Sequence, residues 1–354
     1  MMRNPLGLIA ATFVTAILIA AVWFWTSSPR TEAATAPATV KAAQADRPAA
    51  PARPAAASGS DITGSIASTR PATPTPAPAP QTTAAIAQPT GAPCTNPDAL
   101  GVSRVVEVDT TGGPGFGFEH FKQLDFLTDK EVVLTFDDGP WPGNTPAVLK
   151  ALADQCTKAV FFSIGKHAGY HPEILRQVYA AGHTVGAHTW SHANLNSKKL
   201  SDQQVKDEIE KGFSAVKLAL GTAPAAFFRF PELQHNANAM TYLGTRNIAV
   251  FSCDLDSFDF RKTSTPDKVV NTVMTKLDKL GKGIILMHDF QKHTADALPE
   301  LLRRLKAGGY KVVQMKSKAP AETLPEYDEM VLKDGKVPVA SGRPVNSVVQ
   351  TVSQ

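Results

Sequence analysis

The chain has 354 residues and a formal net charge of +4 at pH 7, and no run of Lys or Arg stands out in it. This charge pattern gives no support to a nucleic-acid-binding function. The length alone would suffice for two domains, but the composition varies so strongly along the chain that we predict one folded domain, residues 94–317.

The N-terminal segment, residues 1–29, contains an uncharged apolar run from Leu6 to Trp25 that follows Arg3. About 20 apolar residues span a bilayer as a helix, whereas the apolar part of a cleaved signal peptide has about 7–15 residues. We therefore expect a single-pass membrane anchor, with a cleaved signal peptide as the alternative. Both predict that the folded domain is exported to the periplasm or cell surface, anchored in the first case and secreted in the second.

Two further segments are not expected to form a core. Residues 30–93 are dominated by Ala, Pro, Thr and Ser, so they can bury too little apolar surface to offset the entropy of ordering, and we predict a disordered linker. Residues 318–354 contain scattered prolines and polar residues, and we expect a C-terminal extension on the surface.

Within residues 94–317, short apolar runs alternate with segments of helical periodicity. Pro146, Pro172 and Pro266 each follow a residue that we expect to cap a helix, and Ser201 with Gln204 forms a capping-box pattern. The alternation predicts βα units around a parallel sheet. Strands are expected at Val105–Val108, Val132–Phe136, Ala159–Ile164, Thr184–Ala187, Ala226–Phe230, Ile248–Ser252, Ile284–Met287 and Lys311–Gln314.

Polar side chains follow several of these runs, at the point where each strand is expected to end. In a barrel of βα units the carboxyl ends of the strands lie at one face, where catalytic residues gather. We therefore expect a functional site at this face. The residues are Asp137 with Asp138, His188, Arg229, Asp254, and His288 with Asp289.

Asp138, His188 and His192 can provide a carboxylate oxygen and two imidazole nitrogens for a divalent metal ion, which leaves positions for water and substrate. Asp137 is then placed to take a proton from that water. Taken separately, Asp-Gly-Pro is common in turns, and two histidines four residues apart are more often structural than metal-binding. Together, the residues favour metal-assisted hydrolysis.

Two more residues are candidates for the same chemistry. Arg229 emerges from an apolar run and is expected to bind a carboxylate, with Asp137 the first choice and an unrelated salt bridge the alternative. His288 can protonate a leaving amine if a carboxylate raises its pKa, and Asp256 and Asp259 are both candidates. A buried histidine bonded to the backbone is the alternative for His288.

The three cysteines fit an exported protein only loosely. Cys94 and Cys156 can form a disulfide that joins the first residues of the domain to its body, and unrelated thiols are the alternative. Cys253 lies in an apolar strand and is expected to be a small buried hydrophobic residue.

Five segments together resemble the polysaccharide deacetylase family, which is carbohydrate esterase family 4 and is also called the NodB homology domain. The resemblance extends over about residues 130–316. The segments are Thr135–Pro140, His188–His192, Arg229–Pro231, Asp256–Phe260 and Leu286–Asp289.

The resemblance implies an α/β fold, a distorted (β/α) barrel, that binds zinc or a similar divalent ion such as cobalt, nickel or manganese. It implies Asp137 as the general base and Arg229 as the residue that orients it. The implied metal ligands are Asp138, His188 and His192.

For the other half of the site, the resemblance implies His288 as the general acid and Asp259, ahead of Asp256, as its partner. Leu286 is implied to line a pocket for the methyl group of the acetyl substituent.

Two residues depart from the family's pattern. Glu232 follows Pro231 in the expected substrate-binding region, where the family commonly has an aromatic residue, and its backbone N–H is implied to stabilise the oxyanion. Phe260 stands in place of a common tryptophan. Both changes are expected to affect substrate preference more than the reaction itself.

These features predict a metal-dependent hydrolase that removes N-acetyl groups from N-acetylglucosamine units and releases acetate. An exported domain favours an N-acetylated envelope polysaccharide as substrate, such as peptidoglycan, a chitooligosaccharide or a related polymer, and no obligate protein partner is evident. Two other hypotheses are a catalytically silent protein that binds cell-wall polysaccharide on the same fold, and a metal amidase that acts on a non-sugar amide.

Overall fold

The computed structural model describes residues 94–334. The predicted membrane segment, the predicted linker and residues 335–354 of the C-terminal extension lie outside the described residues. Within the described part of the chain, no helix combines the length and the apolar character needed to cross a membrane.

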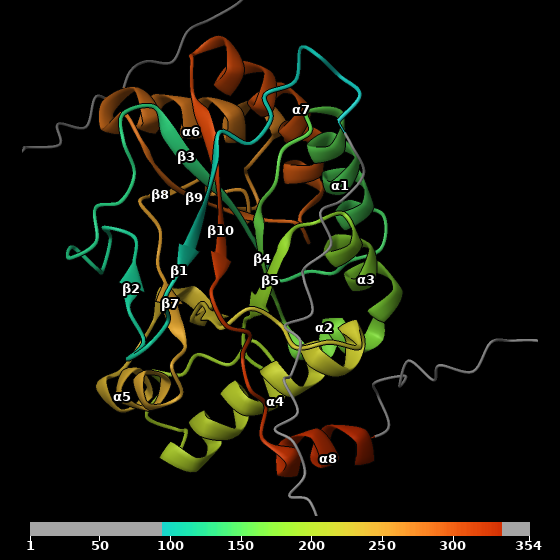
Figure 1. Ribbon diagram of the computed structural model, residues 1–354, viewed down its shortest axis with the longest axis vertical. Helices are drawn as coiled ribbons and strands as arrows, with labels where there is room; N and C mark the ends of the chain where they lie inside the picture. The colour runs from blue at the N-terminus through green and yellow to red at the C-terminus, as the bar shows by residue number, and fades with distance from the viewer. Residues whose placement is uncertain (1–93, 335–354) are drawn as a thin grey trace, which may run out of the picture. The chain divides into compact units, whose positions relative to one another are not determined.

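A parallel sheet forms the centre of the domain (Figure 1). Its strands are β1 (Arg104–Val108), β2 (Gly115–Phe116), β3 (Glu131–Asp137), β4 (Val160–Ser163), β5 (Thr184–Ala187), β6 (Phe227–Phe228), β7 (Ala249–Phe251), β8 (Leu255–Asp256), β9 (Gly283–His288) and β10 (Lys311–Ser317). Hydrogen-bonded neighbours follow the order β8-β9-β3-β4-β5-β6-β7-β2, and β10 joins the first residues of β3 to β1. This α/β arrangement is consistent with the distorted barrel expected from the sequence.

Helices alternate with most of the strands along the chain (Figure 1). They are α1 (Asn144–Asp154), α2 (Gly165–Tyr170), α3 (Pro172–Ala180), α4 (Asp202–Leu220), α5 (Ala237–Thr245), α6 (Pro266–Leu280), α7 (Lys292–Ala307) and α8 (Pro325–Lys333), with a 3₁₀ turn η1 at Pro231–Leu233. The capping box predicted for α4 is present, since the Ser201 side chain accepts from the Gln204 N–H. Glycines with left-handed φ angles, Gly221 at 76° and Gly281 at 77°, end α4 and α6.

One predicted helix cap is wrong. Thr145 was expected to cap α1, but α1 begins at Asn144, the residue before Thr145. Gly143 therefore occupies the capping position, and it makes no side-chain hydrogen bond. The Thr145 hydroxyl is fully buried and is used elsewhere, because it accepts from the Trp141 N–H and donates to Asp289. A tertiary contact has overridden the local preference.

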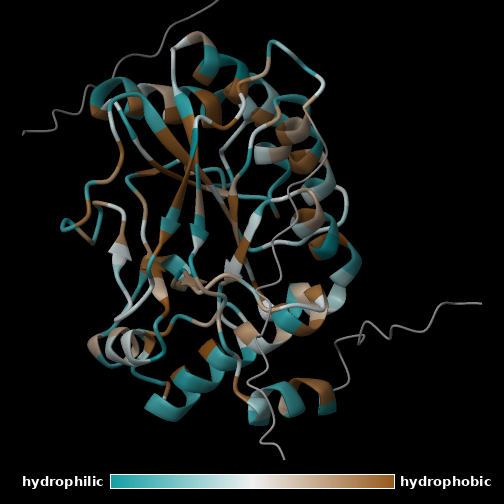
Figure 2. Ribbon diagram, viewed as in Figure 1, coloured by the Kyte–Doolittle hydropathy of each residue, from teal (hydrophilic) through white to brown (hydrophobic). Residues whose placement is uncertain are grey.

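The core lies on both faces of the sheet, as is usual for parallel strands. All seven residues of β3 are buried. One face packs against the apolar sides of α1, α3, α6 and α7, and the other face fills the interior with residues such as Val133, Phe162 and Phe251. Figure 2 shows the strands as the most continuous hydrophobic segments, with hydrophilic residues on the outer helix surfaces.

The structure confirms the disulfide between Cys94 and Cys156, which joins residues 62 apart in the sequence. It attaches the first described residue to the end of α1. Cys253 is a buried free thiol, as predicted.

The folded domain continues beyond residue 317, where we expected a surface extension to begin. Helix α8 packs on α4 (Figure 1), with Tyr327 and Val331 buried. The Tyr327 hydroxyl donates to Asp207 Oδ1 over 2.8 Å, and Lys217 Nζ lies 2.8 Å from Asp328 Oδ2. Two of the scattered prolines that suggested a surface extension, Pro320 and Pro325, precede and open this helix.

Replacing Val331 by Ala should lower the free energy of unfolding by about 2 kcal/mol, because two buried carbon groups are lost and a cavity remains. Met330→Ala, on the exposed side of the same helix, should change it by less than about 0.5 kcal/mol. Urea unfolding followed by circular dichroism measures both values. Equal effects of the two substitutions would contradict the packing of α8 on α4.

Candidate metal centre and active site

The carboxyl ends of four parallel strands bring most of the predicted site residues to one face of the sheet. Asp137 ends β3, and His288 ends β9 directly beside it in the strand register. His188 follows β5 and Arg229 follows β6, which pairs with β5 at Ala187 and Phe228. Residues that lie far apart in the sequence are therefore neighbours because the strands are parallel.

Asp138, His188 and His192 form a compact group that can hold a metal ion, with one ligand atom from each residue within 4.8 Å of the others. The distance from Asp138 Oδ1 is 3.5 Å to His188 Nε2 and 3.4 Å to His192 Nε2. Asp138 Oδ1 is buried and has no hydrogen-bond partner among the described residues. A buried carboxylate oxygen without a partner is costly, and a cation at this position would satisfy it.

The protonation of His188 also fits a metal ligand. Its Nδ1 lies 2.7 Å from the Arg229 carbonyl oxygen, so Nδ1 carries the proton and the lone pair of Nε2 faces Asp138. Burial lowers the pKa of His188 despite the nearby carboxylates, which favours the neutral imidazole that metals bind.

The backbone is held in unusual conformations where the ligands lie. Asp138 has a φ of 76° and His192 a φ of 62°, and Thr189 between the two histidines has a φ of 65°. Non-glycine residues in this region carry strain of about 1 kcal/mol or more each, and such residues cluster at functional sites. The Thr189 hydroxyl accepts from the His192 N–H over 3.0 Å and helps to hold this turn.

Arg229 holds Asp137 in a fixed orientation. Its fully buried guanidinium donates from Nη1 to Asp137 Oδ1 over 2.7 Å and to Thr135 Oγ1 over 2.8 Å. Its Nη2 donates to the Ser252 carbonyl over 2.8 Å. The other oxygen of Asp137, Oδ2, lies 3.9 Å from His188 Nε2 and therefore faces the candidate metal position.

His288 is paired with Asp259, and not with Asp256. His288 Nδ1 lies 2.7 Å from Asp259 Oδ1, while Asp259 Oδ2 accepts from the His288 N–H and from the Thr294 hydroxyl. Burial alone would lower the pKa of His288, but the charge and hydrogen bond of Asp259 outweigh it and raise the pKa to about 10. Asp256 instead accepts from the Phe258 N–H.

A buried network that the sequence did not reveal fixes the loop after β3. Asp289 Oδ1 accepts from the Gly139 N–H over 3.0 Å, and its Oδ2 accepts from Thr145 Oγ1 over 2.6 Å. A side chain at Gly139 would collide with Asp289, because a Cβ there would lie 2.1 Å from Oδ2. Asp289 thus connects the strand end that carries His288 to the loop that carries Asp138.

The predicted substrate-side residues lie around this centre. Leu286 is buried in β9 two residues before His288, so its side chain points to the same face of the strand. Pro231 opens η1, where Glu232 has a φ of 56° and an exposed side chain that accepts from Asn194 Nδ2 over 2.8 Å. Phe260 is exposed, with its ring centroid 5.6 Å from that of His288.

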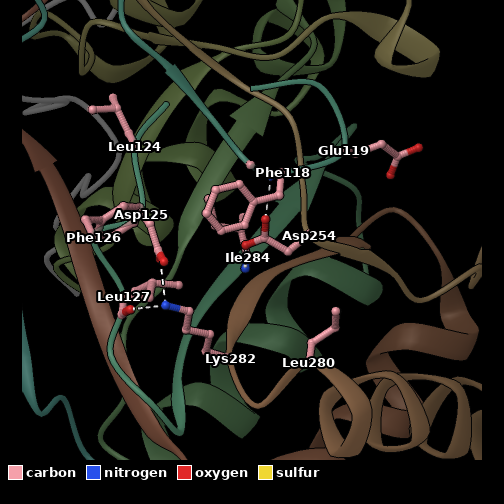
Figure 3. A pocket seen from close by; sticks show the side chains of 11 residues that line it. Phe118, Glu119, Leu124, Asp125, Phe126, Leu127, Asp254, Leu280, Lys282 and Ile284 are labelled. Atoms are coloured by element: carbon pink, nitrogen blue, oxygen red, sulfur yellow. Dashed lines mark hydrogen bonds and ion pairs between the residues drawn. The ribbon is translucent and has the colours of Figure 1, made fainter. Parts of the chain in front are cut away.

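Asp254 does not belong to the site, contrary to expectation. The chain turns back after β7, so Asp254 lies beside the start of β9 and accepts from the Phe118 and Ile284 N–H groups, each over 2.6 Å (Figure 3). It lines a cavity of about 410 Å³ that shares no residue with the candidate metal group. A different cavity, of about 300 Å³, adjoins Asp138 and His192.

Comparison with known proteins agrees with this geometry. The family model for polysaccharide deacetylase matches residues 127–249. A peptidoglycan-N-acetylglucosamine deacetylase of Bacillus cereus is 30% identical over 53% of this chain and 67% of its own length. A chitooligosaccharide deacetylase of Sinorhizobium fredii is 30% identical over 53% of this chain and 95% of its own length. The chain belongs to the polysaccharide deacetylase family.

Two other similarities cover a smaller share of the related protein's own length. The peptidoglycan-N-acetylglucosamine deacetylase PgdA of Listeria monocytogenes is 34% identical over 52% of this chain, which spans only 38% of that relative's length. Among solved structures, the peptidoglycan deacetylase Bd3279 of Bdellovibrio bacteriovorus superposes with a TM-score of 0.56 and 29% identity, over 66% of this chain and 64% of that chain.

Replacing Thr145 by Val should lower the free energy of unfolding by about 2–4 kcal/mol, because Asp289 Oδ2 and the Trp141 N–H would each lose a hydrogen-bond partner. Thr145→Ser keeps the hydroxyl and should cost about 1 kcal/mol or less. Denaturant unfolding of both variants provides the comparison. A Val variant as stable as the Ser variant would show that the network does not hold this loop.

Proposed function

We propose that the protein is a metal-dependent N-deacetylase that removes acetyl groups from N-acetylglucosamine units of an envelope polysaccharide and releases acetate. The observation that carries the proposal is the unpartnered, buried Asp138 Oδ1 facing two imidazole nitrogens, with the oriented carboxylate of Asp137 beside it. The family of the chain and the activities for which its relatives are named support the same reaction.

Asp138, His188 and His192 would hold the metal ion. One carboxylate oxygen and two imidazole nitrogens suit zinc, and cobalt, nickel and manganese are alternatives. When bound, a divalent ion supplies Lewis-acid polarisation of the acetyl carbonyl and makes a water molecule easier to deprotonate.

The chain's own residues supply the proton transfers. Asp137 takes the proton from the attacking water, and Arg229 keeps Asp137 aimed because it donates to the other carboxylate oxygen. His288 donates a proton to the departing nitrogen of the sugar, and Asp259 keeps His288 protonated and oriented. The products are acetate and a sugar with a free amino group.

The remaining predicted residues surround the reacting group. The backbone N–H of Glu232, in η1, is proposed to donate to the oxyanion, with Pro231 fixing the turn that presents it. Leu286 is proposed to contact the acetyl methyl group from the same face of β9 as His288.

We also propose that the domain acts outside the cytoplasm, tethered by a single-pass membrane anchor. The apolar run from Leu6 to Trp25 and the Ala- and Pro-rich residues 30–93 support this proposal. Such a tether suits a polymeric substrate in the cell envelope.

Acetate release from N-acetylated chitooligosaccharides and from peptidoglycan tests the function. We expect release that a chelator abolishes and added divalent metal restores. Asp137→Asn should lower kcat by at least about 100-fold while metal stays bound, because only the base is lost. His188→Ala should lose the metal itself, as measured by elemental analysis of the purified protein.

Binding of polysaccharide that is insensitive to chelator and yields no acetate would support the silent binding protein instead. Near-normal rates in Asp137→Asn would show that the base is another residue. Hydrolysis of a non-sugar amide without activity on N-acetylated sugars would favour the amidase hypothesis.

Asp259→Asn should shift the alkaline limb of the kcat/KM profile to lower pH by roughly one to three units. His288 must be protonated to act as an acid, so activity falls as pH rises through its pKa, and Asp259 raises that pKa. Asp256→Asn is the matched control, because Asp256 makes no hydrogen bond to His288 in the described residues, and the limb should stay within about half a unit. A limb that stays in place in Asp259→Asn would refute the role of His288 as the acid.

A further inference from the structure

The cavity that adjoins the metal group extends beyond the residues that the reaction uses. It has a volume of about 300 Å³. Its lining contains Asp138, Ser191 and His192, and also Lys166, Tyr170 and Phe290. The proposed mechanism assigns a role to Asp138 and His192 only, so the other lining residues call for their own explanation.

Two aromatic lining residues, Tyr170 and Phe290, form an aromatic wall of this cavity. Tyr170, the last residue of α2, is 50% exposed, and Phe290 is half-buried directly after Asp289. Trp141 packs edge-on against Phe290, with ring centroids 5.0 Å apart. Aromatic rings that line a cavity are suited to contact the apolar faces of sugar rings.

This wall is held rigidly to the catalytic loops. The Phe290 carbonyl accepts from Asn144 Nδ2 over 2.7 Å. His167, whose ring centroid is 5.2 Å from that of Trp141, lies with Nδ1 2.6 Å from the Asp138 carbonyl oxygen. A ligand on the wall would therefore bind at a fixed place relative to the reacting centre, with little ordering cost.

Lys166 gives the cavity a positive charge that no acid among the described residues neutralises. Its side chain is half-buried, and within residues 94–334 no carboxylate oxygen lies within 4.0 Å of its Nζ. The only acid lining the cavity is Asp138, whose Oδ1 faces the two imidazoles. The backbone of Lys166 is fixed by its N–H, which donates to the Trp190 carbonyl over 2.9 Å.

We propose that this cavity binds the sugar next to the one that is deacetylated, and that Lys166 pairs with an acidic substituent on that neighbouring sugar. The inference rests on the proposed function and names the class of substrate. A glycan in which N-acetylglucosamine alternates with a carboxylated sugar, as in peptidoglycan, satisfies the Lys166 charge. A neutral homopolymer leaves this charge in the cavity without a partner.

Two tetrasaccharide probes of equal length test the proposal. One is N-acetylchitotetraose, which is neutral, and the other is the peptide-free peptidoglycan tetrasaccharide, in which alternate sugars carry a lactyl carboxylate. We expect the wild type to show a kcat/KM about three- to fivefold higher for the acidic probe, the size of one partly screened ion pair. The preference should shrink as ionic strength rises.

Substitutions test whether Lys166 causes the preference for the acidic probe. Lys166→Gln should bring the ratio of the two kcat/KM values close to one, whereas Lys166→Arg should keep it above one. Tyr170→Ala should raise KM for both probes, since both present sugar faces to the wall. Lys150→Gln, on the outer surface of α1, is the control and should leave the ratio as in the wild type.

The possible failures are distinguishable. Wild type that releases no acetate from either probe overturns the proposed function itself. Acetate release from both probes with a ratio near one, or a ratio that is the same in Lys166→Gln and wild type, overturns the inference about Lys166 and leaves the deacetylase function standing.

Discussion

Three groups that can bind a metal ion face a single point in this protein. Asp138 Oδ1 has no hydrogen-bond partner among the described residues, and the Nε2 atoms of His188 and His192 lie 3.4–3.5 Å from it. A buried carboxylate oxygen without a partner lowers the stability of the fold. The three residues keep these positions because each is held by another hydrogen bond: His188 by the Arg229 carbonyl, His192 by Thr189, and the Asp138 N–H by the Phe162 carbonyl.

The tethers cross between strands, and this makes the site rigid. Arg229 is the clearest case, because its carbonyl fixes the candidate ligand His188 while its guanidinium fixes the proposed base Asp137. On the other side, Asp259 fixes His288, and Asp289 fixes the loop that follows Asp137. The buried charges of Arg229, Asp137 and Asp259 are tolerated because each has hydrogen-bonded partners. Rigid placement of such groups is what stabilises developing charge during a reaction.

Much of this arrangement could be predicted from the sequence. Continuous apolar runs located the long strands, and Ser201 with Gln204 located the start of α4, because these signals are local. The spacing of His188 and His192 and the adjacent aspartates indicated the metal group for the same reason. Strands β2 and β8 were missed because two residues carry no periodicity.

The rest depended on contacts between distant residues. The residues alone left both Asp256 and Asp259 as partners of His288, and the family resemblance favoured Asp259. The packing of β9 against the loop that follows β8 confirms Asp259. Thr145 is a residue type that often caps helices, but its hydroxyl donates a hydrogen bond to Asp289, 144 residues away. Helix α8 lacked a clear signal since its stability comes from packing on α4, not from its own composition.

The division of the site along the chain explains why similarity alone does not identify the substrate. Residues 127–249, which match the family model, contain the proposed base, its arginine and the candidate metal ligands. His288, Asp259 and Phe290 lie beyond that segment. The relatives include enzymes named for peptidoglycan and for chitooligosaccharides at similar identity, so similarity to them does not identify the polymer. Selectivity must therefore come from side chains that line the cavity without joining the proposed reaction. Lys166 and Tyr170 are such residues, because they line the cavity with Asp138 and His192 while no step of the proposed hydrolysis needs them.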